Sequence, residues 1–196
     1  RGLGDVYKRQ VLDVPFSYAE LFETAVNGIR SQNELAQESS EVADFWSMLQ
    51  GFQTSGKCVD KAHYRIRYMK SFRPISVKED IEFKEARPIL YLNMAAVASL
   101  FNSRNMNATA NRSNWSTIMF YLKSHSSYLG LKQNRFTILL PSGLPDYSIE
   151  IVNNEQVRKV KINRPKALCF DYLQLKEAFG LELETEVITD VQDSED

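Results

Sequence analysis

The sequence predicts an α+β fold, in which a pair of N-terminal helices precedes a larger domain of strands and helices that contains a basic β-hairpin. Apolar residues recur at helical spacing in residues 17–56, whereas the short apolar runs typical of strands begin near residue 63. The charge changes at the same place. Residues 11–56 hold one Arg and seven Asp or Glu, and residues 57–176 hold twenty Lys or Arg against nine Asp or Glu. We therefore expect an acidic helical segment over 11–56 and a basic α+β domain over 57–180.

The N-terminal helical segment begins with a capping box. Ser17 is followed three residues later by Glu20, so each side chain can accept a hydrogen bond from the other residue's backbone N–H. The first helix is expected to end near Ser39, and Ser39 or Ser40 is expected to cap a second helix that ends at Gly56. The apolar stripes of the two helices, which predict core packing, are Phe22, Ala25, Val26 and Ile29, then Val42, Phe45, Trp46, Leu49 and Phe52.

Strand signals follow in the basic domain. Residues 63–69 alternate between apolar and basic side chains, which predicts a half-exposed strand. Residues 81–83 are a second, short candidate. Pro88–Leu92 is typical of a buried strand, with proline at its start, where no ladder donor is lost. Asn93 is then placed to cap a helix that runs from Met94 to about Arg104.

The helix with the clearest pattern is predicted over Trp115–His125, after a polar loop at Asn105–Asn114. Its apolar face consists of Trp115, Ile118, Met119 and Leu122, at the spacing i, i+3, i+4 and i+7. The opposite face carries hydroxyls and aromatic rings with a lysine at its flank, namely Ser116, Thr117, Phe120, Tyr121, Ser124 and Lys123.

A strand and a hairpin are expected after Gly130, which ends this helical unit. The strand is Arg135–Leu140. The hairpin consists of Tyr147–Val152 and Val157–Ile162, two largely alternating runs joined by residues 153–156. The basic residues of its second arm are Arg158, Lys159 and Lys161.

The C-terminal part adds one more strand and helix before an acidic tail. Ala167–Phe170 is an apolar strand, and Tyr172–Phe179 is a helix with Gly180 as its C-cap. Residues 182–196 hold seven Asp or Glu and no Lys or Arg. We therefore expect residues 181–196 to form a solvated, disordered tail.

The order helix, polar loop, helix, strand, turn and hairpin is that of a winged-helix domain, with Trp115–His125 as the recognition helix and the basic hairpin as the wing. Residues 87–145 hold six Lys or Arg and no Asp or Glu. Basic side chains neutralise phosphates, and exposed aromatic rings stack on unpaired bases. The expected contacts with single- or double-stranded DNA are Arg112, Asn114, Ser116, Thr117, Phe120, Tyr121, Lys123, Arg158, Lys159 and Lys161.

Other interpretations of these residues stay open. The aromatic side chains could pack beneath the N-terminal helices, and the basic surface could dock on the protein's own acidic helices or tail. A second functional hypothesis is an assembly domain, in which the apolar stripes of residues 18–52 pack against an upstream ATPase or a neighbouring subunit.

The sequence offers no catalytic constellation, so we expect a non-catalytic module without metal or cofactor. Cys58 and His63 lack the second close pair of ligands that is usual in a structural zinc site. His125 between two serines does not by itself give the geometry of a catalytic triad. The two cysteines, Cys58 and Cys169, fit a reducing compartment, and the apolar runs are far shorter than the ~20 residues of a membrane-spanning helix. A cytoplasmic location without membrane contact is therefore expected.

Four segments resemble the C-terminal region that follows the ATPase core in primase-helicase-like replication proteins of bacterial mobile elements and phages. They are NGIRSQNELAQESSEVADFWSML (27–49), ARPILYLNMAAVASLF (86–101), STIMFYLKSHSSYLG (116–130) and KALCFDYLQL (166–175). The resemblance covers roughly residues 16–176 and implies a DNA-binding or partner-docking module of a replicative helicase. None of the eight glycines completes the phosphate-binding motif Gly-x-x-x-x-Gly-Lys-Ser/Thr, so any ATPase or helicase activity is expected upstream.

The first ten residues are set apart from the rest. Asp5–Gln10 (DVYKRQ) resembles the translation of a transposon-end adapter used in sequencing libraries, and the sequence does not begin with Met. We expect residues 1–10 to be an artefact of a metagenomic fragment and the natural protein to continue upstream. The alternative is a natural Gly-rich turn with a basic patch.

Overall fold

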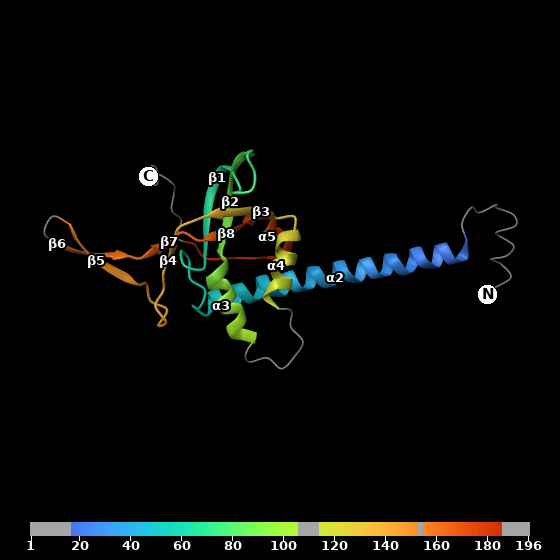
Figure 1. Ribbon diagram of the computed structural model, residues 1–196, viewed down its shortest axis with the longest axis horizontal. Helices are drawn as coiled ribbons and strands as arrows, with labels where there is room; N and C mark the ends of the chain where they lie inside the picture. Colours follow the sequence, from blue (N-terminus) through green and yellow to red (C-terminus); the bar gives the residue numbers. More distant parts are fainter. Residues whose placement is uncertain (1–16, 106–113, 153–154, 186–196) are drawn as a thin grey trace. The chain divides into compact units, whose positions relative to one another are not determined.

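The computed structural model describes residues 17–105, 114–152 and 155–185 (Figure 1). It contains two compact units, residues 1–40 and residues 41–196. The predicted helical pair is a single helix in the structure, α2 (Tyr18–Thr54), and the division between the units falls between Ser40 and Glu41. The helix continues through Ser39 and Ser40 because no glycine or proline lies between Gly28 and Gly51, and serine alone lowers helix propensity only slightly.

The predicted capping box at the start of α2 is confirmed. The backbone N–H of Ser17 donates to Glu20 Oε2 (2.5 Å), and that of Glu20 donates to Ser17 Oγ (3.1 Å). In the first unit, Phe22 and Ile29 of the predicted apolar stripe are exposed, with 62% and 60% of their surface accessible. In the second unit, the stripe is buried in the core, as expected for Val42, Phe45, Trp46 and Leu49.

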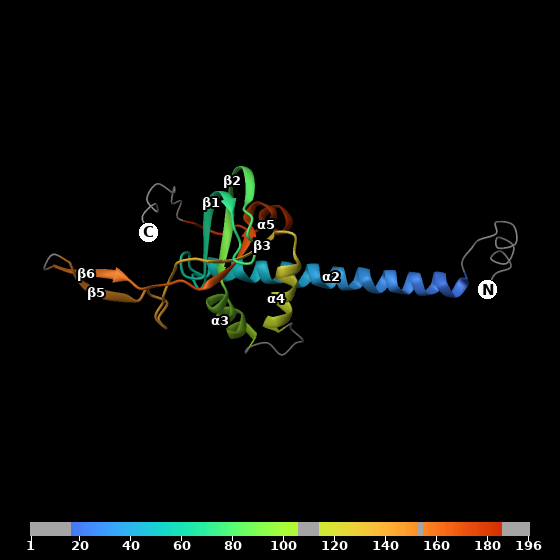
Figure 2. The ribbon, with the colours of Figure 1, turned by 45° about the horizontal axis from the view of Figure 1, so that its top comes forward.

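The second unit is built on a four-stranded antiparallel sheet of order β1-β2-β8-β3 (Figure 2). Its strands are β1 (Tyr64–Phe72), β2 (Ile81–Asn93), β3 (Tyr128–Gln133) and β8 (Lys166–Asp171). The two separate strands expected at 81–83 and 88–92 are therefore one strand, β2. It tolerates Pro88 because pairing with β8 begins only at Ile89, so Pro88 has a partner on one side alone, in β1.

Helices cover one face of this sheet. They are the C-terminal part of α2, α3 (Met94–Asn105), α4 (Trp115–Ser124) and α5 (Tyr172–Phe179). The core between them and the sheet includes Trp46, whose ring lies 5.2 Å from that of Phe170 in β8. Two caps are formed as predicted: Asn93 Oδ1 accepts from Ala96 N–H, and Gly180 closes α5 in the left-handed conformation (φ 63°). Asn114, which was expected only as part of a loop and as a DNA contact, caps α4.

The other face of the sheet is covered by the end of the β1–β2 hairpin. Phe72 is fully buried there against Tyr91, with 6.4 Å between the ring centroids. Beyond it the chain crosses to β3, where the backbone N–H of Ile75 donates to the carbonyl of Leu131 (2.8 Å). Because both faces are covered, β8 is buried along almost its whole length.

Strand β3 was not predicted, and the strand expected at Arg135–Leu140 is reduced to the two-residue β4 (Phe136–Thr137), paired with β7 (Ile162–Asn163). Gly130 does not end the helical unit but lies inside β3, at an irregularity in its register with β8. Its backbone has φ 126°, a conformation that side chains disfavour. Gly130, which the sequence suggested as the end of the helical unit, therefore marks a β-bulge in β3.

Gly130→Ala is expected to lower the free energy of unfolding of the second unit by about 1–3 kcal/mol. A Cβ at this position would lie 2.7 Å from Cβ of Pro74, in addition to the unfavourable φ. Gly51→Ala in α2 is the matched control, since nothing lies within 4 Å of its Cβ position and alanine favours a helix. Urea unfolding should show opposite signs for the two variants, and equal effects would contradict this role of Gly130.

The predicted hairpin is confirmed as β5 (Tyr147–Val152) and β6 (Glu155–Val160), which form a sheet of their own. The predicted connection between the two strands was too long, because Glu155 and Gln156 already pair with β5.

The predicted disordered tail is wrong for its first residues. Leu183 is buried, its backbone N–H donates to Tyr172 Oη (2.8 Å), and Tyr64 Oη donates to the carbonyl of Glu184 (2.5 Å). Residues 186–196 lie outside the described residues, as does most of the loop expected at 105–114.

Candidate nucleic-acid interface

The N-terminal turn of α4 uses three of the predicted DNA contacts for capping. Asn114 Oδ1 accepts from the backbone N–H of Thr117 (2.9 Å), from Thr117 Oγ1 (3.0 Å) and from Ser116 Oγ. The Asn114 side chain thereby satisfies the N–H of Thr117, one of the otherwise unpaired N–H groups at the helix start. Asn114 and Ser116 are exposed and Thr117 is half-buried, so their first role is structural. Arg112 lies outside the described residues.

The outer face of α4 is exposed in part: Ser116, Phe120, Lys123 and Ser124 are exposed, whereas Thr117 and Tyr121 are half-buried and Tyr121 packs against the core. Ile118, Met119 and Leu122 point into the core, and Phe120 on the opposite face is 66% exposed. Tyr121 is half-buried, and its ring meets that of Phe120 edge to face, with 5.8 Å between centroids. Lys123 is exposed and forms no ion pair with a described residue. We call Phe120, Tyr121 and Lys123 the α4 outer face.

The basic residues of the hairpin differ from this face because the hairpin's own carboxylates neutralise two of them. Lys159 Nζ lies 3.1 Å from Glu150 Oε2, and Lys161 Nζ lies 2.8 Å from Asp146 Oδ2. Arg158 is exposed and forms no ion pair with a described residue. Surface ion pairs of this kind are weak, but they reduce the positive field that a phosphate would meet.

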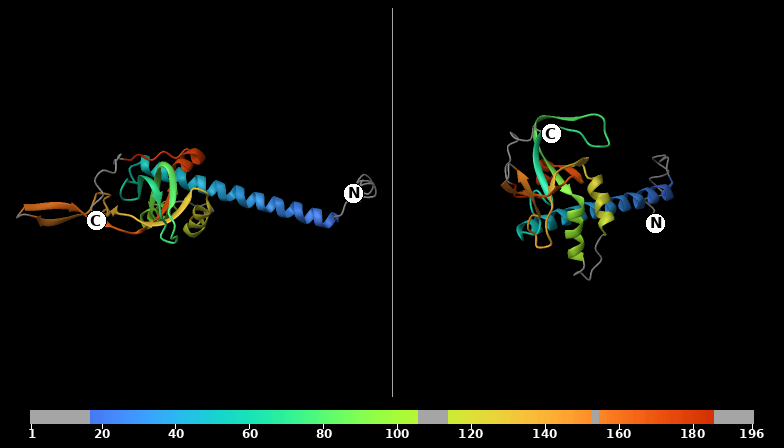
Figure 3. Two further views of the ribbon diagram at one scale, coloured as in Figure 1. Left: turned by 90° about the horizontal axis from the view of Figure 1, so that it is seen from above. Right: turned by 60° about the vertical axis from the view of Figure 1, so that its left-hand side comes forward.

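The structure does not bring the two halves of the predicted interface together. Figure 1 shows β5 and β6 on the left of the sheet, whereas α4 lies on its right, and the views in Figures 2 and 3 agree. A wing that shared one DNA site with the recognition helix would lie beside that helix. The nine predicted contacts that the structure describes therefore divide into an α4 group and a hairpin group.

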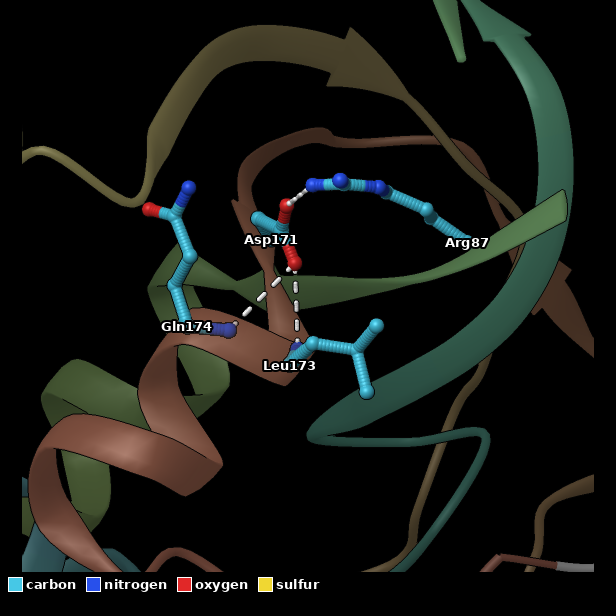
Figure 4. Close-up of polar contacts among 4 residues, drawn as sticks. All are labelled: Arg87, Asp171, Leu173 and Gln174. Atoms are coloured by element: carbon cyan, nitrogen blue, oxygen red, sulfur yellow. Dashed lines mark hydrogen bonds and ion pairs between the residues drawn. The ribbon is translucent and has the colours of Figure 1, made fainter. Parts of the chain in front are cut away.

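An ion pair with a buried carboxylate, which the sequence did not reveal, joins β2, β8 and α5 (Figure 4). Arg87 Nη1 donates to Asp171 Oδ2 (2.8 Å), and the side chain of Asp171 is only 3% exposed. Its other oxygen, Oδ1, accepts from the backbone N–H groups of Leu173 (3.1 Å) and Gln174 (3.4 Å), so Asp171 also caps α5. A carboxylate between an apolar strand and a helix is a capping signal, but the arginine lies 84 residues away in sequence.

This pair removes Arg87 from the set of free basic residues. Its guanidinium is bonded to Asp171 and lies over the ring of Phe83, 5.6 Å from the centroid. Both oxygens of the Asp171 carboxylate are used, one by Arg87 and the other by the backbone of α5. Asp171 is therefore a structural residue.

The cysteines and histidines give no sign of a reactive or metal-binding centre in the described residues. Burial raises the pKa of Cys58 and of Cys169 to about 12, so both are thiols at neutral pH. Burial lowers the pKa of His63, whose Nδ1 accepts from the backbone N–H of Val59 (3.1 Å). His125 Nδ1 lies 2.7 Å from the hydroxyl of Ser127, which is fully buried. In the ranges that the structure describes, no three His, Cys, Asp or Glu side chains are grouped to hold a metal ion.

No described helix combines the length and apolar character needed to cross a membrane.

Comparison with known proteins gives no assignment. No protein-family model matches the chain, and no curated protein or solved structure matches it.

Proposed function

We propose that this chain is a non-catalytic nucleic-acid-binding module and that it contacts DNA through the α4 outer face. The observation that carries the proposal is the exposed Phe120 on the same helix as Lys123, which forms no ion pair with a described residue, within 59 residues (87–145) that contain no carboxylate. The charge of the second unit supports it: residues 41–185 hold twenty Lys or Arg and fourteen Asp or Glu, which gives a net charge of +6. A basic surface with exposed rings binds phosphates electrostatically and stacks on bases.

The wider setting that we propose is a DNA replication protein of the primase-helicase type, with an upstream ATPase and a cytoplasmic location. This setting rests on the sequence resemblance. The winged-helix assignment belongs to the proposal too, since α3, α4 and the hairpin occur in the required order. With the hairpin on the other side of the sheet, we expect α4 to provide the main contact and Arg158 to contribute little to the same site.

The proposal is tested by fluorescence anisotropy with labelled single- and double-stranded DNA at two salt concentrations. We expect affinity to fall steeply with salt, because bound phosphates release counterions. Lys123→Glu should weaken binding to both DNAs. Phe120→Ala should weaken binding to single strands by about 1–3 kcal/mol, because only unpaired bases are free to stack on the ring.

Lys78→Glu is the matched control, since it makes the same change of charge at an exposed position between β1 and β2. A loss of affinity equal to that of Lys123→Glu would mean that net charge, and not the α4 outer face, determines binding. Absence of binding to either DNA at low salt would refute the proposed function.

A second candidate is an assembly domain that docks on the upstream ATPase or a like subunit through the first part of α2. The exposed Leu21, Phe22 and Ile29 favour it, because three large apolar side chains on one helix are a usual partner surface. Phe22→Asp would then abolish the association while DNA binding is unchanged.

A further inference from the structure

The β5–β6 hairpin has an apolar face that no described residue covers. Tyr147, Ile149 and Ile151 alternate along β5 and point to the same side of the hairpin. Their exposed fractions are 47%, 66% and 73%, which is unusual for a row of three large apolar side chains. Their neighbours across the hairpin on that face are Val160, Arg158 and Gln156. The only charge on this face is therefore that of Arg158.

The edges of the hairpin differ in their protection against pairing. β5 and β6 form a two-stranded sheet, so among the described strands each has one edge without a partner. Proteins usually protect such edges with charged residues, above all lysine. β6 carries Glu155, Arg158 and Lys159, whereas β5 carries a single charge, Glu150. The β5 edge is therefore the one that is open to another strand.

We propose that β5 is a self-association edge, which pairs antiparallel with β5 of a second copy of this chain about a two-fold axis at Ile149. In that register Ile149 faces its own copy, Tyr147 faces Ile151, and Ser148 faces Glu150. No like charges meet, and a hydroxyl meets a carboxylate, so the strand is complementary to itself, as a two-fold interface requires.

The pairing extends each hairpin into a four-stranded sheet with one continuous apolar face of six side chains. The equivalent pairing of β6 centred on Arg158 would place two arginines opposite each other. A pairing of β6 centred on Val157 avoids this repulsion between arginines, but the edge of β6 carries more charged residues than that of β5. Val157 is also less exposed (44%) than Ile149 or Ile151. The inference does not depend on the proposed DNA contact, because the hairpin and the α4 outer face are separate.

The first test is sedimentation of the full chain over a range of concentrations. We expect a reversible dimer, and we expect Ile149→Lys and Ile151→Lys to be monomeric at concentrations where the unaltered chain is dimeric. Both positions are exposed, so both variants should fold, which circular dichroism verifies. Ile162→Lys is the matched control: it has a similar exposure (55%) but lies in β7, and it should remain dimeric.

The second test is disulfide trapping, which determines the register in which the two copies of β5 pair. Ile149→Cys should give a disulfide-linked dimer on oxidation, because the residue faces its own copy. Ile151→Cys alone should not, since the two copies of residue 151 would lie about 13 Å apart along the strands. Tyr147→Cys combined with Ile151→Cys should again be linked. Cys58 and Cys169 are buried, so the background is low.

Several outcomes would overturn the inference. They are a monomer at all concentrations, cross-linking through Val157→Cys in place of Ile149→Cys, and loss of the dimer in Phe22→Asp but not in Ile149→Lys. The last result would assign the association to α2. DNA affinity of the monomeric Ile149→Lys variant separates this question from the proposed function, since the α4 outer face is unchanged in it.

Discussion

Replacing Asp171 with alanine is expected to lower the free energy of unfolding by about 2–4 kcal/mol. The change removes the cap of α5 and leaves the backbone N–H groups of Leu173 and Gln174 without their acceptor. It also leaves the guanidinium of Arg87 without its carboxylate. Because Arg87 is itself 45% exposed, water compensates part of that loss. Urea unfolding with an unchanged m-value would measure the effect.

Two further variants separate the contributions at this site. Asp171→Asn keeps an oxygen for the cap but loses the charge, so its effect should be smaller than that of alanine. Asp80→Ala is the control, because Asp80 pairs with Arg73 at the surface, where both side chains are well exposed. We expect it to cost less than about 1 kcal/mol. Equal effects of Asp80→Ala and Asp171→Ala would contradict the structural importance of the pair between Arg87 and Asp171.

Leu49→Ala is expected to have an equal or larger effect, about 2–5 kcal/mol. Leu49 lies in the C-terminal part of α2 and is fully buried in the core between the helices and the sheet. Truncation removes apolar contacts and leaves a cavity that the neighbouring strands can fill only in part. Thermal or urea unfolding of the full chain, followed by the near-ultraviolet signal of the core aromatic residues, measures the loss.

Phe22→Ala tests the other part of the same helix. Its side chain is 62% exposed, so the change should alter stability by no more than about 0.5 kcal/mol. A large loss for Phe22→Ala, or a small one for Leu49→Ala, would contradict the division of α2 between two compact units. The two variants therefore measure how far the core of the second unit extends along the helix.

The sequence by itself determined the elements that depend on nearby residues. The capping box at Ser17, the cap Asn93 and the glycine that closes α5 act within one helical turn, so the residue types reveal them. The α4 outer face was predicted for the same reason, because helical periodicity assigns each side chain to a face. The two arms of the hairpin followed from alternation and a polar turn.

Only the tertiary structure decided how these elements combine. Pairing with β1, which extends from Ile81 to Leu92, makes residues 81–93 one strand. β8 lies between β2 and β3 although it comes last in sequence, and its pairing with β3 makes Tyr128–Gln133 a strand. The pairing of Arg87 with Asp171 and the separation of the hairpin from α4 depend on the same strand order. Local patterns specify which face a residue occupies, but a strand's partner is selected by long-range packing, which leaves no signal within a short window of sequence.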